Sequence, residues 1–349
     1  MSSIRYSVIV PAYQAEATIG YCVRALNAQT IPRNLYEIIV VDDGSTDQTA
    51  LVAHQAGADR VLTIPHEGPA AARNAGVEIA RGEIILFTDS DCEPWPDWLE
   101  RMTAPFVDPE VMGAKGVYRT RQRALMARLT QLEYEFRYER MARLSSIDFI
   151  DTYAAAYRRE VFLRYGGFAN DIPIPSVEDI DFSFRLARAG HRLVFVPDAR
   201  VWHIHPSNLR GYLTRKARYG FWRGLLYLWH PEKRKGDAHT DPALKKQFAL
   251  LALMVLSLVG GLFWRPLVLG VAVALLAFLW TTLPFVRWAW TRDRAVALAW
   301  PWVTLLRGLF QGAGLAVGLA YHRFFKRRLF SEKRCLPEAS AGHKSGLKL

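Results

Sequence analysis

Residues 60–91 read RVLTIPHEGPAAARNAGVEIARGEIILFTDSD and contain the pattern that decides the fold. A short apolar run, 60–64, leads through a helical pattern with Pro69 near its first turn to a second apolar run, 83–87. Neither run alternates with polar residues, which is typical of parallel strands covered by helices on both faces. The stretch therefore predicts a strand–helix–strand unit of a parallel sheet, with the sequence DSD at 89–91 directly after its second strand.

Two earlier apolar runs, YSVIV at 6–10 and EIIVV at 37–41, extend the same sheet. In an open α/β sheet, ligands bind beyond the carboxyl ends of the strands. The run at 37–41 leads into Asp42 and Asp43, so acidic residues follow two strands at one sheet edge. These carboxylates would repel one another unless a divalent cation with a bound diphosphate lay between them. No GxGxxG or GxxxxGK sequence follows a strand, which disfavours a dinucleotide-binding enzyme and a P-loop enzyme.

Each acidic cluster also has a structural interpretation. Residues 43–47, DGSTD, are of the types that turns use, and Ser45 to Gln48 is a capping-box pattern for a following helix. Asp89 and Asp91 are harder to explain in this way, because two carboxylates one residue apart can share a hard cation with phosphate oxygens. Each motif is weak alone. Together, at the ends of the second and fourth predicted strands, they indicate a metal and diphosphate site.

The chain resembles the inverting family 2 glycosyltransferases, which have the GT-A fold. The resemblance covers about residues 5–210 and rests on four stretches in this order: SVIVPAYQAEATI (7–19), IIVVDDGSTDQT (38–49), GPAAARNAGVEIARGEIILFTDSD (68–91) and SVEDIDFSFRLARAG (176–190). It implies an α/β fold of the GT-A type, with a Rossmann-like, mostly parallel sheet and flanking helices.

The resemblance also implies which residues hold a nucleotide-sugar donor and a Mg²⁺ or Mn²⁺ ion. In the family, the Asp after the second strand binds the base or ribose, and the DxD motif binds ribose and metal. The implied donor-binding residues are Pro11, Tyr13, Asp43, Arg73 and Asp89, and the implied metal ligand is Asp91. We expect a UDP-sugar as the donor.

Glu178 and Asp179 match an ED motif whose Asp is the catalytic base in the family. Acidic residues in a helix's first turn after Ser176 are also what capping and the helix dipole favour. An acceptor hydroxyl that attacks an anomeric carbon must lose its proton, and a positioned carboxylate can accept it. We therefore expect Asp179 to be the base, with Glu178 as the alternative base or as a residue that holds the acceptor. Direct displacement would invert the anomeric configuration.

Two histidines and an arginine complete the predicted site. His203 and His205 follow a predicted strand, and either can complete the coordination of a metal on Asp91, although structural histidines are as good an explanation. Residues 215–222, RKARYGFW, occupy the place where processive family members carry a QxxRW motif, which is absent, so polymerisation is disfavoured. Arg218 can contact a diphosphate, while basic and aromatic residues beside a membrane are the commoner explanation.

The C-terminal part has the pattern of a membrane region. Runs 248–264 and 266–286 contain no charged residue, and each approaches the roughly 20 residues that cross a bilayer. A third run, 295–321, is interrupted by a proline and an arginine and is followed by a basic cluster at 326–328. Three crossings would place that cluster on the far side from the N-terminal domain, against the positive-inside rule. We predict two spans and a re-entrant or in-plane third segment, in which Gly314 and Gly318 form a helix-packing notch.

Charge and hydropathy divide the chain into four parts. We predict a GT-A domain at 1–208, a basic aromatic interfacial linker at 209–246, membrane-embedded helices at 247–325 and a basic flexible tail at 326–349. Of the 45 Lys and Arg residues, 23 follow residue 204, against 6 of the 33 Asp and Glu, so the basic excess is C-terminal. Positive charge beside apolar runs predicts membrane lipid as a partner, and no nucleic acid. The N-terminal apolar run is too short for a signal peptide, which predicts a cytoplasmic catalytic domain on a multi-pass inner or plasma membrane protein.

The leading hypothesis is a metal-dependent inverting glycosyltransferase. It would move a sugar from a nucleotide-diphosphate donor to a polyprenyl-phosphate-linked or polysaccharide acceptor at the cytoplasmic membrane face. A nucleotidyltransferase of similar fold normally shows a basic, glycine-rich loop after its first strand, which PAYQ at 11–14 does not provide. A non-catalytic membrane scaffold would give no reason for acidic residues at three separate points of one site.

Overall fold

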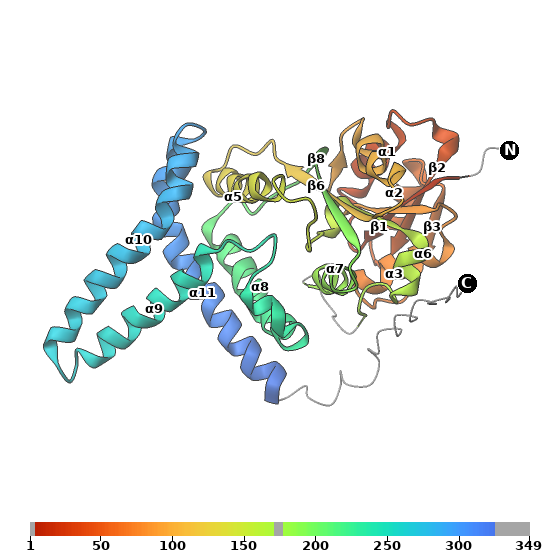
Figure 1. Ribbon diagram of the computed structural model, residues 1–349. Helices are drawn as coiled ribbons and strands as arrows, with labels where there is room; N and C mark the ends of the chain where they lie inside the picture. The colour runs from red at the N-terminus through yellow and green to blue at the C-terminus, as the bar shows by residue number, and fades with distance from the viewer. Residues whose placement is uncertain (1–3, 171–176, 325–349) are drawn as a thin grey trace, which may run out of the picture.

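The computed structural model of this chain describes residues 4–170 and 177–324. It has an α/β domain built on one eight-stranded sheet and a group of long helices to one side of it (Figure 1). The strand order in the sheet is β3-β2-β1-β4-β7-β6-β8-β5. The strands are β1 (Tyr6–Ala12), β2 (Tyr36–Asp42), β3 (Arg60–Thr63), β4 (Ile84–Phe87), β5 (Glu93–Pro94), β6 (Val111–Arg119), β7 (Ala155–Arg158) and β8 (Arg192–Trp202).

The four strands that the sequence predicted lie side by side and are parallel. β1 pairs with β2 so that Ala12 lies opposite Asp42, and with β4 so that Ile9 lies opposite Phe87. The residues that follow these three strands therefore emerge at one edge of the sheet. β7 joins β4 in the antiparallel sense and links this half to β6 and β8, which are parallel to each other. The mixed, mostly parallel sheet of the GT-A type is confirmed.

Helices cover both faces of the sheet, which explains why its strands lack polar alternation. Val8 and Ile9 are neighbours in β1, so their side chains point to opposite faces of the sheet. Val8 packs in the core that contains Trp98, and Ile9 packs in the core that contains Phe162. All four side chains are buried. The helices of this domain are α1 (Ile19–Asn27), α2 (Thr49–Gln55), α3 (Pro69–Ile79), α4 (Trp98–Thr103), α5 (Leu125–Met141), α6 (Arg159–Arg164) and α7 (Glu178–Arg188), with 3₁₀ turns at Arg33–Leu35, Ala104–Val107 and Thr152–Ala154.

The capping box expected at residues 45–48 does not form. Helix α2 begins at Thr49, whose amide donates to the carboxylate of Asp47. The hydroxyl of Ser45 instead accepts a hydrogen bond from the amide of Gln14 at 2.9 Å. Ser45 therefore ties the loop after β2 to the loop after β1, at the sheet edge where the sequence places the site.

The C-terminal helices are α8 (Leu209–Trp229), α9 (Ala243–Gly260), α10 (Val268–Trp290) and α11 (Arg294–Phe324), with 3₁₀ turns at Pro231–Lys235 and Arg265–Leu267. Helices α9 and α10 form a hairpin that projects away from the α/β domain (Figure 1). Large apolar side chains such as Leu256, Phe263 and Trp280 lie exposed on it. Three helical segments, Ala243–Gly260, Arg265–Trp290 and Arg294–Phe324, are long and apolar enough to cross a membrane.

The third apolar run forms one continuous helix, although a proline and an arginine interrupt its apolar sequence. Arg307 is buried, and its guanidinium donates to Glu133 at 3.0 Å and to Gln247 at 2.9 Å. Its positive charge is therefore paired within the protein. Pro301 lies within α11 without ending it. The basic cluster at 326–328 and the predicted tail lie outside the described residues.

Helices α8 and α11 run in parallel and touch through glycines. A Cβ atom at Gly314 would lie 2.1 Å from the carbonyl oxygen of Ala217, and one at Gly318 would lie 2.1 Å from that of Phe221. On the facing helix, a Cβ at Gly220 would lie 2.2 Å from the carbonyl oxygen of Gln311. Only glycine permits backbones to approach so closely, so the helix-packing notch predicted at 314 and 318 is confirmed.

Candidate active site

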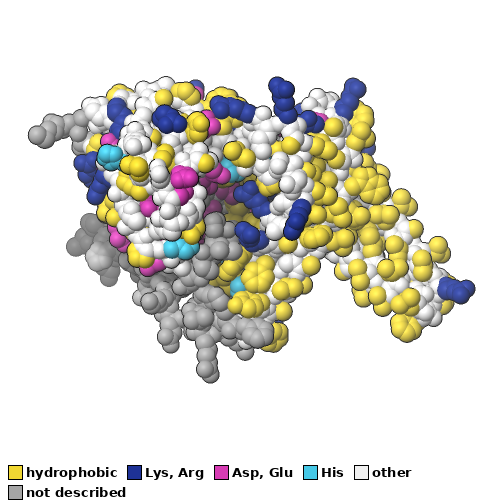
Figure 2. Space-filling view, turned by 180° about the vertical axis from the view of Figure 1, so that it is seen from behind, with side chains coloured by type: hydrophobic (Ala, Val, Ile, Leu, Met, Phe, Trp, Pro, Cys, Tyr) yellow, Lys and Arg dark blue, Asp and Glu magenta, His cyan; other side chains and the backbone are white. Residues whose placement is uncertain are grey.

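A cavity of about 820 Å³ lies between the sheet edge and helix α8. Four acidic residues line it: Asp89, Asp151, Glu178 and Asp179. Three arginines of α8 also line it: Arg210, Arg215 and Arg218. Figure 2 shows acidic side chains gathered in a hollow beside basic ones, with hydrophobic side chains covering the helices beyond. Opposite charges on facing walls suit a ligand that carries an anionic group and a metal ion together.

Arg73 joins two motifs that are far apart in the sequence. Its Nη2 donates to Asp89 Oδ1 at 2.8 Å and its Nη1 donates to Glu178 Oε1 at 3.0 Å, with the Arg73 side chain 4% exposed. Helix α3 carries Arg73 one turn from its start at Pro69, which aims the side chain across the ends of the strands. The buried guanidinium carries a positive charge that both carboxylates contact, and an unpaired charge would be costly to bury there.

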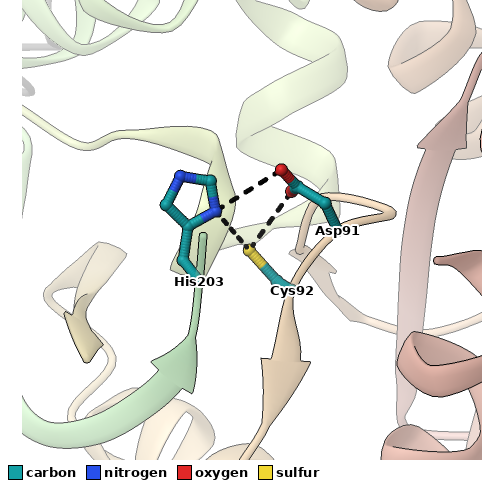
Figure 3. Close-up of side chains that lie close together, drawn as sticks. All are labelled: Asp91, Cys92 and His203. Atoms are coloured by element: carbon teal, nitrogen blue, oxygen red, sulfur yellow. Dashed lines mark hydrogen bonds and ion pairs between the residues drawn. The ribbon is translucent and has the colours of Figure 1, made fainter. Parts of the chain in front are cut away.

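Asp91, Cys92 and His203 form a cluster of potential metal ligands beside the cavity (Figure 3). The Nδ1 atom of His203 lies 3.5 Å from Asp91 Oδ2 and 3.8 Å from Cys92 Sγ. Asp91 comes from the loop after β4, and His203 from the residue after β8, so the sheet brings them together. The His203 ring stacks on Tyr118, a residue that lines the cavity.

The cluster fits a divalent cation. Carboxylate oxygen and imidazole nitrogen are donors that Mn²⁺ accepts, and the three donor atoms lie within 4.8 Å of one another. The Asp91 side chain is 42% exposed, whereas His203 is buried. In the described structure, the Nδ1 atom of His203 faces Asp91 and Cys92, and its Nε2 atom has no hydrogen-bond partner.

His205, the other predicted ligand, is held in a different direction. Its Nε2 lies 2.9 Å from Oε1 of Gln131 on α5, and its amide donates to Gln122. Burial, assisted by the nearby His203 and Arg215, lowers the pKa of His205 to about 3, so its ring is neutral. The geometry brings His203 to Asp91 and places His205, in the segment after β8, against Gln131 of α5.

Asp179 lies in the first turn of α7 and lines the cavity. Its Oδ2 accepts a hydrogen bond from the amide of Thr152 at 3.2 Å, which fixes the direction of the carboxylate. Burial, and then the negative charges of Glu178 and Asp151, raise the pKa of Asp179 well above its usual range. A carboxylate with a raised pKa is a stronger proton acceptor than an ordinary aspartate.

A fourth acidic residue and its buried partner were missed by sequence reasoning. Asp151 lines the cavity and forms an ion pair with Lys115 of β6, whose side chain is fully buried. Lys115 also donates to the hydroxyl of Tyr153 at 3.2 Å. Lys115 stands in an apolar strand and Asp151 in an irregular segment, so no local motif marked either residue.

The predicted base-binding residues lie at the ends of β1 and β2 and are not among the residues that line the cavity. Asp43 is buried, and its carboxylate accepts hydrogen bonds from the amides of Glu67 and Gly68 and faces His66 Nδ1 at 2.9 Å. The exposed ring of Tyr13 stacks on His66, with ring centroids 4.1 Å apart. Pro11 lies buried within β1. Asp43 thus holds the loop that leads into α3, and His66 is a neighbour that the sequence did not indicate.

The basic residues of α8 serve two different places. Arg215 and Arg218 are exposed and line the cavity, and neither forms an ion pair with a described residue. Lys216 points the other way and donates to Glu133 Oε1 at 2.8 Å, in a buried cluster that also includes Arg137 and Arg307. The helical spacing of α8 therefore divides one basic stretch between the cavity and the interior.

Comparisons with known proteins identify the domain that carries this site. Residues 7–166 match the sequence model of glycosyl transferase family 2. The pre-mycofactocin glycosyltransferase of Mycobacterium tuberculosis is 33% identical over 235 residues, which are 64% of this chain and 48% of that protein. Glycosyltransferase AglE of Haloferax volcanii is 29% identical over 234 residues, 64% of this chain and 73% of that protein. The chain spans about half the length of the first of these relatives.

A solved structure extends the likeness to the long helices. Mannosyltransferase PcManGT from Pyrobaculum calidifontis, solved with GDP-Man and Mn²⁺, is 22% identical, with a TM-score of 0.57 over 94% of this chain and 89% of that one. At this identity the likeness concerns the fold. The family match and the fold agree, and the chain therefore carries a glycosyl transferase family 2 domain of the GT-A type, followed by long apolar helices.

Proposed function

We propose that this chain is a metal-dependent, inverting glycosyltransferase that uses a nucleotide-diphosphate sugar. The acceptor in this proposal is a polyprenyl-phosphate-linked sugar or a growing polysaccharide at the cytoplasmic face of the inner or plasma membrane. The observation that carries the proposal is the cavity in which Asp89 and Asp179 face Arg215 and Arg218. The family 2 domain supports transfer of a sugar over any other use of that arrangement.

In this proposal the base of the donor lies at the ends of β1 and β2, and its diphosphate lies in the cavity. Tyr13 presents an exposed ring for a base at the end of β1, and Asp43 lies buried at the neighbouring strand end. Arg215 and Arg218 add positive charge to the cavity, which would serve a phosphate of a membrane-embedded acceptor or the donor diphosphate, since Arg73 is already engaged with Asp89. A UDP-sugar remains the first donor to test, and GDP-sugars are the second.

Asp91 and His203 are the residues we assign to Mg²⁺ or Mn²⁺, with Cys92 beside them. A bound divalent ion would neutralise the negative charge that develops on the departing diphosphate. The imidazole nitrogen favours Mn²⁺ over Mg²⁺, which prefers oxygen ligands and bound water.

Asp179 is the residue we assign as the general base. The acceptor hydroxyl oxygen forms a bond to the anomeric carbon of the donor sugar while the bond from that carbon to the phosphate oxygen breaks. The hydroxyl proton passes to the Asp179 carboxylate, and the electron pair of the broken bond leaves with the nucleoside diphosphate. Attack from the face opposite the leaving group inverts the anomeric configuration.

The helices support a membrane position for this reaction. Helix α8 is attached to the α/β domain at both ends: it follows β8 directly, and His230, just beyond its last residue, lies 2.9 Å from Asp181 of α7. Helix α11 packs along α8 from residue 311 onward, so it is held to the α/β domain through α8. This arrangement favours two crossings by the α9–α10 hairpin and an in-plane α11.

Donor binding by the full chain in detergent tests the proposal. We expect one nucleotide-sugar to raise the melting temperature in the presence of Mn²⁺ and to leave it unchanged in the presence of a chelator. Release of pyrophosphate from a nucleoside triphosphate and a sugar phosphate would instead indicate a nucleotidyltransferase. Failure of every nucleotide-sugar to bind would support the scaffold hypothesis.

A further inference from the structure

A second cavity, of about 620 Å³, lies at the junction between the α/β domain and the membrane hairpin. We call it the junction pocket. Its lining comes from α5, from the start of α9, from the last turns of α10 and from α11, and it shares no residue with the active-site cavity. It is therefore a separate site, lined by residues at the start of α9 and toward the end of α10, the two ends of the hairpin that Figure 1 shows joined to the rest of the molecule.

The rim of the junction pocket is strongly basic. Arg143 follows α5, Lys246 lies in the first turn of α9 and Arg287 lies in the last turn of α10, and all three are exposed. None of them forms an ion pair or a side-chain hydrogen bond with a described residue. Arg140 adds a fourth cation, whose guanidinium donates to the carbonyl of Ala238. Helices α9 and α10 and the residues just after α5 thus bring unpaired positive charge to one pocket.

The acidic residues in the junction pocket do not neutralise this rim. Glu139 accepts from the indole of Trp288 at 2.6 Å and pairs with Arg292 at 3.0 Å. Asp241 accepts from the amide of Ala243 at 2.8 Å, at the start of α9. Both carboxylates therefore already serve contacts that hold the helices in place, and the excess of positive charge persists.

The walls below the rim are apolar and aromatic. Trp280, Leu283 and Phe285 from α10 and Trp300 from α11 line them. Trp280 is 72% exposed, and its spacing places it on the same face of α10 as the exposed Val273 and Leu276. A basic rim above an aromatic wall matches the headgroup and the upper acyl chain of a membrane lipid.

Arg140, the fourth cation of the pocket, is partly buried beside other positive charges. Burial, together with the neighbouring Arg137 and despite Asp241, lowers the pKa of Arg140 from its usual value. Like charges gathered in a partly buried cavity repel one another, and a bound anion removes that cost. Phosphate suits such a rim, because arginine and lysine donate charge-assisted hydrogen bonds to its oxygens.

We propose that the junction pocket binds the phosphate headgroup of an anionic membrane phospholipid. Arg143, Lys246 and Arg287 hold the phosphate, and Trp280 contacts the acyl chains. The bound lipid fastens the hairpin to the α/β domain from the membrane side. This inference does not depend on the proposed function, because the pocket and the active-site cavity have no residue in common.

Native mass spectrometry of the full chain in detergent, titrated with phosphatidylglycerol or phosphatidylcholine, tests this site. We expect the parent to retain phosphatidylglycerol in preference to phosphatidylcholine. The triple variant Arg143→Gln, Lys246→Gln, Arg287→Gln should lose on the order of a hundredfold in affinity for phosphatidylglycerol. The matched control Lys235→Gln, Lys245→Gln, Arg294→Gln removes the same charge from exposed residues outside the pocket and should bind like the parent.

Several outcomes would overturn the assignment. Equal losses in the two triple variants, or no preference for phosphatidylglycerol in the parent, would exclude a specific headgroup site. Displacement of the lipid by inorganic phosphate would identify a soluble anion as the ligand, and displacement by a polyprenyl phosphate would assign the pocket to an acceptor. The variant Arg143→Lys, Arg287→Lys keeps the charge and should retain the lipid, which separates loss of binding from loss of folding.

Discussion

Arg73 Nη1 lies 3.0 Å from Glu178 Oε1, although 105 positions of sequence separate the two residues. The same guanidinium reaches Asp89 at 2.8 Å. One buried cation therefore joins the loop after β4 to the start of α7, which also carries Asp179. The relative position of the two acidic motifs depends on this contact.

Arg73→Gln should destabilise the protein, because it removes the cation that faces two carboxylates. Breaking a buried ion pair from one side costs about 3–5 kcal/mol, so we expect a markedly lower melting temperature. The double variant Arg73→Gln, Glu178→Gln also removes one of the carboxylates and should recover part of the loss. A single variant that melts like the parent would show that the contact contributes nothing to stability.

Asp179→Asn should leave donor binding intact while transfer slows by about 10²–10⁴-fold, the effect of losing a general base. Glu178→Gln is the comparison: if it causes the larger loss of kcat, the base is Glu178. In the parent, the raised pKa of Asp179 means that activity is present above this pKa and disappears as pH falls through it. The acid limb of kcat/KM should therefore lie above the usual aspartate value of about 3.9.

The two histidines should differ in their effect on metal binding. His203→Gln removes the nitrogen that faces Asp91, so Mn²⁺ affinity should fall by about tenfold or more. His205→Gln alters a residue that contacts α5, so it should retain Mn²⁺ affinity while lowering the melting temperature. Isothermal titration with Mn²⁺ alone measures the Mn²⁺ affinity of both variants. The reverse order of affinities would assign the ligand to His205.

Neighbouring basic residues of α8 should give different phenotypes. Arg215→Gln, Arg218→Gln removes two exposed charges worth about 1 kcal/mol each beside a membrane, so use of a vesicle-embedded acceptor should fall roughly thirtyfold, and less at high salt. Lys216→Gln should lower the melting temperature, because Lys216 contacts buried Glu133. If donor hydrolysis in detergent falls as much as the membrane reaction, the two arginines serve the donor diphosphate instead.

Gly314→Ala should weaken the packing of α11 on α8, since its Cβ would lie 2.1 Å from the carbonyl oxygen of Ala217. Gly312→Ala is a matched control two residues away, where the Cβ would make an ordinary contact at 3.5 Å with Phe248. Alanine is about 1 kcal/mol better than glycine within a helix, so the control should melt at or above the parent temperature. Equal behaviour of the two variants would contradict the close approach of the helices.

The sequence by itself determined the four parallel strands β1 to β4 and the acidic residues that follow β2 and β4. Apolar runs without alternation indicate strands covered on both faces, and the residues that follow such strands must emerge at one edge. For this reason Asp43, Asp89 and Asp91 could be placed before any coordinates existed. The apolar helices were equally predictable, because length and lack of charge are local properties.

Only the tertiary structure decided which of these residues touch. The contacts of Arg73 with Glu178, of Asp151 with Lys115 and of Arg307 with Glu133 join segments far apart in the chain. No periodicity or motif records such contacts, because each depends on how strands are ordered in the sheet and how helices lie against it. The same reason explains why the sequence left His203 and His205 equivalent: they are two residues apart on an extended segment, and packing alone turns one ring toward Asp91 and the other toward α5.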